Sequence, residues 1–139
     1  MPNVQAAVKG ILMRNGKFLI VKQKLSGFSV WDLPGGRIKY GSDPVSCLIR
    51  EFREETDMNV EVIKPVGTWY FFRENGGDQV VLTTFLCRHV SGEVDLGKNT
   101  DKEENLTEYK WVSPEEFMSD DFDTGHESFK KMIRDYFRL

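Results

Sequence analysis

The sequence predicts an α/β protein of the α+β type, in which helices pack on the faces of a mixed β-sheet. Strand-forming segments occur mostly in pairs joined by turn residues, so hairpins should build most of the sheet. Two long segments and one short segment carry helical caps or apolar residues at helical spacing. No internal repeat, low-complexity tract or linker divides the 139 residues, so we expect a single domain over residues 1–139.

The first part of the chain should form a β-hairpin followed by a glycine-rich loop. Residues 4–13 are β-branched or small and apolar, Asn-Gly at 15–16 is a type I′ turn signal, and residues 17–23 alternate. The loop after the hairpin contains several glycines and a proline. We expect short strands within it at residues 30–33 and 37–39.

A helix is expected next, over residues 44–56. Ser42 can cap its first N–H groups, and Pro44 suits its first turn. Apolar residues at the i, i+3, i+4, i+7 spacing predict the stripe that faces the core, which consists of Val45, Leu48, Ile49 and Phe52.

The second half of the chain should begin with another hairpin. Residues 59–72 are rich in Val, Ile and aromatic side chains, with a bend expected at Pro65 and Gly67, and a turn separates them from a strand at 79–90. Residues 97–107 are polar and acidic and have no period of their own, so we expect a solvated loop there.

The last part of the chain should hold a strand and two helices. Residues 108–112 alternate as a strand does, and Ser113 with Glu116 forms a capping box that begins a short helix. Thr124 with Glu127 should cap the final helix. The apolar stripe of that helix is Phe129, Met132, Ile133 and Tyr136.

Composition and charge exclude several classes of protein. A net charge of -3 gives no basic patch for a nucleic-acid polymer, so none is expected as a partner. Lys9 and Arg14 interrupt the apolar N-terminus, and no run of 18 apolar residues predicts a membrane span. Cys47 and Cys87 lack metal-ligand spacing, and buried reduced thiols are favoured over a disulfide. These features together predict a cytoplasmic protein.

The helix at 44–56 carries a group of charged residues beside its apolar stripe. Glu51, Glu54 and Glu55 share one arc, with Arg50 at its edge. Carboxylates in this arrangement offer hard oxygen ligands to Mg²⁺ or Mn²⁺. Taken alone, the helix more readily suggests a solvated face with an ordinary i, i+4 ion pair between Arg50 and Glu54.

The loop before this helix changes the interpretation. Glycines after Pro34, at 35–36, let the backbone approach a ligand closely and can present a carbonyl to a metal. Arg37 and Lys39 could then meet phosphate oxygens, so we expect them to bind the substrate. Loop, cations and carboxylates together indicate a site for a metal and a diphosphate.

Residues 36–58 resemble the Nudix box, which reads Gly, five residues, Glu, seven residues, and then Arg-Glu-apolar-any-Glu-Glu-any-Gly-apolar. The run Arg-Glu-Phe-Arg-Glu-Glu at 50–55 has the correct spacing from the Trp-Asp-Leu-Pro-Gly-Gly run at 31–36. Ser42 stands where the box has its first Glu, and Asp57 where it has its Gly. Asp tolerates the left-handed backbone that a glycine takes at a helix end, so only Ser42 removes a functional group.

The resemblance implies a Nudix-like α/β/α sandwich that hydrolyses a nucleoside diphosphate linked to another group, such as a nucleoside triphosphate or a sugar nucleotide. It implies Mg²⁺ or Mn²⁺ as the cofactor and a small nucleotide as the substrate. Arg50 would orient the glutamates, and the general base would be Glu54, Glu103 or Glu104. The implied metal ligands are Gly35, Gly36, Glu51, Glu54 and Glu55.

A second interpretation starts from Ser42, which cannot ligate a metal as a carboxylate does. In that case the chain would be a catalytically impaired Nudix-like domain that binds or senses a nucleotide. A homodimer is compatible with either interpretation. Trp31, Tyr40, Trp69, Tyr70, Phe71 and Phe72 could stack a base, although most should be core, and His89 and His126 are expected to be structural.

Overall fold

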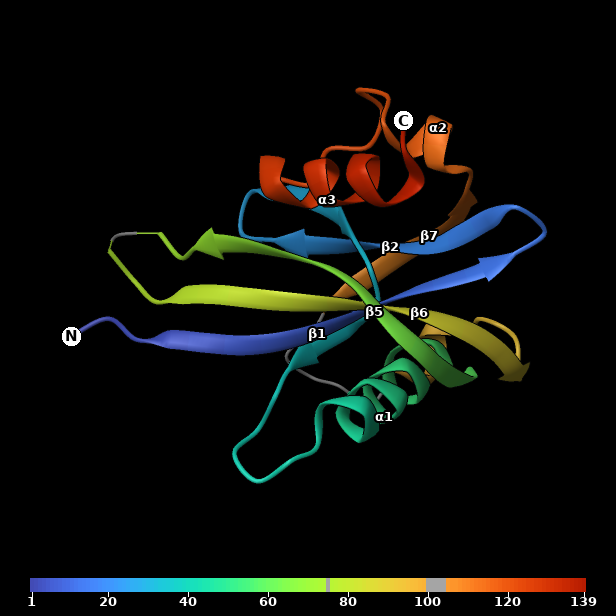
Figure 1. The fold of residues 1–139 in the computed structure, drawn as a ribbon, viewed down its shortest axis with the longest axis horizontal. Helices are drawn as coiled ribbons and strands as arrows, with labels where there is room; N and C mark the ends of the chain where they lie inside the picture. Colours follow the sequence, from blue (N-terminus) through green and yellow to red (C-terminus); the bar gives the residue numbers. More distant parts are fainter. Residues whose placement is uncertain (75, 100–104) are drawn as a thin grey trace.

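A mixed β-sheet is the centre of the fold in the computed structural model, which describes residues 1–74, 76–99 and 105–139 (Figure 1). The strands in these ranges are β1 (Val4–Arg14), β2 (Lys17–Leu25), β3 (Phe28–Asp32), β4 (Gly35–Arg37), β5 (Asn59–Phe72), β6 (Gln79–Ser91) and β7 (Leu106–Val112). The helices are α1 (Pro44–Thr56), α2 (Pro114–Phe117) and α3 (Glu127–Phe137), with a 3₁₀ turn, η1 (Leu96–Lys98).

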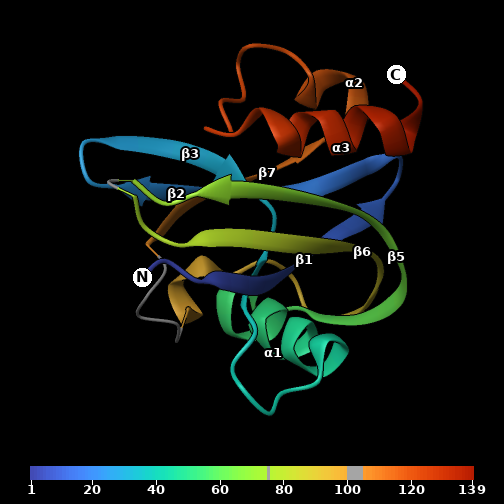
Figure 2. The same cartoon turned by 60° about the vertical axis from the view of Figure 1, so that its left-hand side comes forward.

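The strands follow the order β3-β2-β1-β6-β5, with β4 also paired to β1 and β7 to β2. β1 runs parallel to β6, whereas the other pairs are antiparallel, so the sheet is mixed as predicted (Figure 2). Helix α1 covers one face, and α2 and α3 cover the other (Figure 1). The predicted α/β/α sandwich of the α+β type is therefore confirmed.

The buried run in β1 shows how one strand supplies both layers of the core. Ala7 and Ile11 belong to the apolar cluster that includes residues of α2 and α3. Val8 and Leu12 belong to the cluster beneath α1. Successive side chains of a strand point to opposite faces, so a strand covered on both sides must be apolar at nearly every position.

Several local predictions are confirmed by the structure. Asn15 and Gly16 have φ values of 53° and 78°, which are the positive values that a type I′ hairpin turn requires. The β5–β6 register shifts between Pro65 and Gly67, where the bend was expected. Asp57 ends α1 with a φ of 63° and therefore takes the left-handed conformation of the glycine in the box.

The predicted N-caps of the two long helices were wrong. Asp43, not Ser42, caps α1, because its side chain accepts the Ser46 N–H at 2.9 Å. Proline at the first helical position holds the preceding residue extended, and this places the cap at residue 43. At α3, His126 is the N-cap residue, and the Thr124 hydroxyl instead donates to the His126 carbonyl at 3.0 Å.

The buried face of α1 is rotated about the helix axis relative to the predicted stripe. Val45 is 38% exposed and Ile49 only half-buried, so these two residues do not form the centre of the packed face. The residues that α1 buries are Cys47, Leu48, Glu51, Phe52, Glu55 and Thr56. Two carboxylates are therefore part of the buried face, and hydrophobic periodicity cannot predict this because it assigns charged residues to solvent.

Both cysteines are buried free thiols, as expected. Burial raises the pKa of Cys87 to about 12, which keeps this thiol protonated at neutral pH. Within the described ranges, no helix has the length and apolar character needed to cross a membrane.

Candidate active site

The glycine loop at the start of β4 lies directly against β1. The Gly10 N–H donates to the Pro34 carbonyl at 3.0 Å, and β4 pairs with β1 from the next residue onward. Gly35 has a φ of 143°, and a Cβ at this position would lie 2.0 Å from the Val8 carbonyl oxygen. No residue with a side chain could hold the loop in this position.

Glu55 connects this loop to helix α1. Its side chain is 1% exposed, and its Oε1 accepts the Gly35 N–H at 2.8 Å. A buried carboxylate needs hydrogen bonds to be tolerated, and the loop backbone supplies one. The third glutamate of the motif therefore fixes the relative positions of loop and helix.

Glu51 and Glu54 differ in how far they are buried. Glu51 is 6% exposed and lies against Gly36, where a Cβ would be 3.1 Å from its Cδ and Oε2. Glu54 retains 36% of its side-chain exposure. Arg50 lies 3.9 Å from Glu51 and 3.8 Å from Glu54, so one guanidinium is shared between the two carboxylates.

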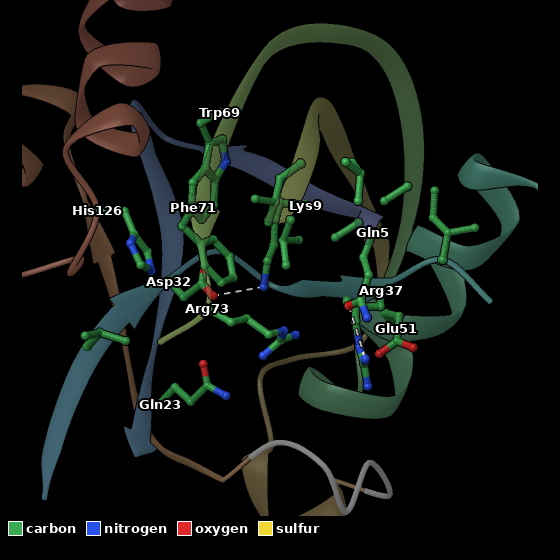
Figure 3. Close-up of a pocket in the computed structure, with 18 of the residues that line it drawn as sticks. Gln5, Lys9, Gln23, Asp32, Arg37, Glu51, Trp69, Phe71, Arg73 and His126 are labelled. Carbon is green, nitrogen blue, oxygen red and sulfur yellow. Dashed lines mark hydrogen bonds and ion pairs between the residues drawn. The ribbon is translucent and has the colours of Figure 1, made fainter. Parts of the chain in front are cut away.

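A cavity of about 1210 Å³ opens beside these residues and extends across the sheet (Figure 3). We call one side of it the carboxylate end; it comprises Gly36, Arg37, Lys39, Glu51 and Glu54. The opposite side is the aromatic end, which comprises Trp69, Phe71, Arg73, Thr124 and His126. In Figure 3, Arg37 and Glu51 lie on one side of Lys9, and Trp69, Phe71 and His126 lie on the other side, where Asp32 also lies.

Stacked rings build the aromatic end. His126 lies parallel to Phe71, with ring centroids 4.4 Å apart, and the Arg73 guanidinium lies 5.9 Å from the Phe71 centroid. Trp69 is buried, and its indole N–H donates to the Thr84 hydroxyl at 3.2 Å. Burial lowers the pKa of His126, although two nearby aspartates act in the opposite direction, so its imidazole is uncharged at neutral pH.

A buried ion pair lies between the two ends. Lys9 Nζ is 2.9 Å from Asp32 Oδ2, and the side chains are 8% and 18% exposed. The second oxygen of Asp32 accepts the Leu33 N–H at 2.7 Å. Both charged residues line the cavity.

The structure brings most of the predicted site residues together. Gly36, Arg37, Lys39, Glu51 and Glu54 line the cavity, and the Arg37 guanidinium donates to the Gln5 amide oxygen at 3.3 Å. Gly35, Arg50 and Glu55 adjoin them through the contacts described above. Glu103 and Glu104, the other predicted general bases, lie outside the described residues.

Sequence reasoning missed the Lys9–Asp32 pair and the role of His126. A lysine within an otherwise apolar strand was the available signal for the pair, because charged residues are rarely buried without a partner. His126 offered no comparable signal, since its partner Phe71 is far away in the sequence.

The carboxylate end is chemically suited to a divalent cation. Its donors are carboxylate and carbonyl oxygens, and the missing Cβ of Gly36 leaves room for Glu51 beside the backbone. Among the described residues, no three His, Cys, Asp or Glu side chains are already gathered as a metal-binding group. This arrangement still fits Mg²⁺, which commonly binds one or two carboxylates together with waters and substrate phosphates.

Residues 3–136 match the model of the NUDIX domain. The chain belongs to the Nudix family. Nudix hydrolase 25 of Arabidopsis thaliana is 24% identical over 97% of this chain and 87% of its own length. An ADP-ribose pyrophosphatase of Methanocaldococcus jannaschii is 27% identical over 70% of this chain and 59% of its own length. A MutT protein structure from Methanosarcina mazei Go1 is 22% identical, with a TM-score of 0.82 over 99% of this chain and 95% of that chain.

The family match confirms the resemblance that the box at 36–58 indicated. This Nudix chain is accordingly a pyrophosphohydrolase. Nudix hydrolases act on nucleoside diphosphate derivatives and generally use a divalent metal. The likeness to the MutT protein structure covers nearly the whole chain and shows that the two proteins share this fold.

Proposed function

We propose that this Nudix domain hydrolyses the pyrophosphate bond of a nucleoside diphosphate linked to another group, with Mg²⁺ or Mn²⁺ as the cofactor. One observation carries the proposal: a single cavity joins the glutamates of the Nudix box to an aromatic compartment. A nucleotide has matching parts, an anionic diphosphate and a flat base. The diphosphate belongs at the carboxylate end and the base at the aromatic end.

The metal would be held by oxygens of Glu51, Glu54 and Glu55 and by a carbonyl of Gly35 or Gly36. When bound, it supplies neutralisation of the diphosphate charge and lowers the pKa of a water molecule. Burial of the Glu51 side chain beside Gly36 holds this ligand in one place before substrate arrives.

Other residues of the carboxylate end position the reacting groups. Arg50 lies within 4 Å of two glutamates and would orient them by ion pairing. Arg37 and Lys39 line the cavity and offer donors to phosphate oxygens. Glu54 is the most exposed of the three glutamates and so is the described residue best placed to accept a proton; Glu103 and Glu104 are the alternatives.

Turnover of a substrate panel with Mg²⁺ or Mn²⁺ tests the proposal. The panel consists of nucleoside triphosphates, sugar nucleotides, dinucleoside polyphosphates and ADP-ribose, the last because of the name of the Methanocaldococcus relative. We expect release of a nucleoside monophosphate from at least one substrate, and loss of that release with EDTA. Tight binding of one compound without turnover of any would instead support the nucleotide-sensing alternative that Ser42 suggests.

A further inference from the structure

Stability by itself does not explain why the Lys9–Asp32 pair is present. Removing two charges from water is costly, and well-packed apolar residues in place of such a pair are often neutral or stabilising. The pair nevertheless lies at 2.9 Å in the wall of the cavity, between its two ends. Its position indicates contact with a ligand.

The floor of the cavity next to this pair is apolar and largely buried. Ala7 and Leu82 are partners in the β1–β6 register, and Val80 lies two residues from Leu82 on the same face. Trp69 and Phe71 are their partners on β5 and continue this surface to the aromatic end. Ala7, Leu82, Val80 and Trp69 are each at most 4% exposed, so the half-buried Phe71 is the ring of this group that can meet the face of a base. Stacking of a base on an aromatic side chain is worth about 1–3 kcal/mol.

The chemistry of the pair also restricts the hydrogen-bonding pattern of a base edge that can bind to it. An ammonium group only donates hydrogen bonds, and a carboxylate only accepts them. A base that meets both must therefore present an acceptor beside a donor. Each oxygen of Asp32 already accepts one hydrogen bond, from Lys9 or from Leu33, and each has a second lone pair.

Guanine matches this pattern most completely. Its Watson–Crick edge has one acceptor, O6, followed by two donors, N1–H and the N2 amino group. Lys9 can donate to O6 while the two Asp32 oxygens accept from the two donors. Adenine, cytosine and uracil each present only one donor group next to an acceptor on that edge, so they leave one carboxylate oxygen without a new partner.

We propose that Lys9 and Asp32 read the base of the substrate and select a guanine nucleotide. The proposal rests on the proposed function for the orientation of the nucleotide, with its phosphates at the carboxylate end. Lys9 and Asp32 are then specificity-determining residues, whereas the glutamates of α1 perform the reaction. A base that lacks the second donor loses one charge-assisted hydrogen bond, which corresponds to roughly tenfold weaker binding.

Binding of the four nucleoside 5′-monophosphates GMP, AMP, CMP and UMP, measured by calorimetry in EDTA, tests the proposal without any turnover. We expect GMP to bind the wild-type chain roughly tenfold more tightly than each of the others. Equal affinity for all four, or a preference for another base, would overturn the proposal. If GMP is preferred but no substrate of the panel is hydrolysed, only the proposed function fails.

The variant Asp32→Asn distinguishes two roles of Asp32, recognition of the base and the hydrogen bond to the Leu33 backbone. Asparagine keeps the oxygen that accepts the Leu33 N–H and replaces the other acceptor by a donor. We expect the preference for GMP to fall to within about threefold of the other nucleotides. The melting temperature should fall as well, because the buried Lys9 ammonium loses its paired charge, so binding is measured well below the melting temperature of the variant. The matched control is Asp135→Asn, which alters a 2.7 Å pair with Lys131 on the exposed side of α3.

A base-free substrate completes the test. Turnover of 5-phosphoribosyl diphosphate or of inorganic tripolyphosphate, whichever the wild type accepts, should be the same in Asp32→Asn. The opposite outcome is that Asp32→Asn weakens binding of every nucleotide equally and lowers turnover of the base-free substrate by the same factor. In that case Asp32 would serve only to hold the Leu33 backbone in place. That result would contradict a role in base selection.

Discussion

The two ends of the cavity are built in different ways. The carboxylate end comes from residues 36–54, which lie close together in the chain on β4, the following loop and α1. The aromatic end combines β5 with the segment that precedes α3, and these are more than 50 residues apart, as the Phe71–His126 stack shows. One end is therefore a local motif, and the other exists only in the assembled fold.

In the proposed function, the carboxylate end carries out the reaction and the aromatic end selects the substrate. The carboxylate end is held by backbone contacts, including the Gly35 N–H bond to Glu55 and the close approach of Gly36 to Glu51. The aromatic end is held by packing between side chains, which can be exchanged without moving the backbone of the reacting groups. We expect substitutions at the first end to lower kcat and substitutions at the second to change substrate affinity.

The largest effect is expected from Glu54→Gln. This change keeps the size of the side chain and removes its charge and basicity, so kcat should fall by about 10²- to 10⁴-fold. The melting temperature should be unchanged, because the side chain is one-third exposed. Steady-state kinetics with Mg²⁺ measures kcat, and Glu115→Gln on the exposed side of α2 is the control. An unchanged kcat would remove Glu54 from the reaction.

The two glycines of the loop should give the next largest effect, and they should differ. Gly36→Ala places a methyl group 3.1 Å from the Glu51 carboxylate, and a small displacement of this proposed metal ligand should lower kcat by up to about a hundredfold. Gly35→Ala meets the Val8 backbone and strains a positive φ, so it should destabilise the fold by at least about 1–3 kcal/mol. Urea unfolding and kcat together distinguish the two outcomes. A Gly36→Ala variant with full activity would contradict the assigned position of Glu51.

At the aromatic end, Phe71→Ala should raise KM and leave kcat nearly unchanged. Loss of one stacking surface corresponds to roughly tenfold weaker nucleotide binding. The neighbouring Phe72 is 64% exposed and does not line the cavity, so Phe72→Ala is a matched control. A fall in kcat with unchanged KM would mean that the aromatic end takes part in the reaction, and the division between the two ends would not hold.

The smallest effect concerns pH and His126. Because burial lowers the pKa of this imidazole in the folded state, the unfolded chain takes up the proton more readily. Stability is therefore complete above the ordinary histidine pKa of about 6.5 and declines as the pH falls toward the lowered value. Urea unfolding at about pH 7.5 and about pH 5.5 should show a smaller loss of stability for His126→Gln than for the wild type.

His89→Gln, on β6 outside the cavity, is the control for this measurement. An equal loss of stability in the wild type and in His126→Gln would show that the imidazole is not held neutral by the aromatic end.

Features set by neighbours in the chain could be predicted from the sequence. The turn at Asn15 and Gly16, the capping box of Ser113 with Glu116 and the C-cap at Asp57 all follow from the backbone preferences of a few adjacent residues. The spacing of the glutamates along α1 is also local, and it identified the family. The cap of α1 was one residue in error because the restriction by Pro44 on its predecessor outweighed the capping preference of Ser42.

Features set by contacts between distant segments could not be predicted. The buried face of α1 includes Glu51 and Glu55 because the β4 loop meets it with a backbone N–H and with the bare surface of Gly36. Hydrophobic periodicity describes one helix in isolation and takes no account of a loop that packs against it. The pairing of Lys9 with Asp32 likewise depends on the strands that carry them meeting at the cavity.

By itself, the sequence determined the mixed sheet with helices on its faces and the set of carboxylates that we propose for the chemistry. The tertiary structure alone decided which of these carboxylates are buried, and it assembled the aromatic end and the ion pair beside it. The physical reason is the sequence separation over which each kind of interaction acts. Turn, cap and helix preferences act over a few residues, whereas a cavity forms only when β1, β5, β6 and α3 have reached their register and packed.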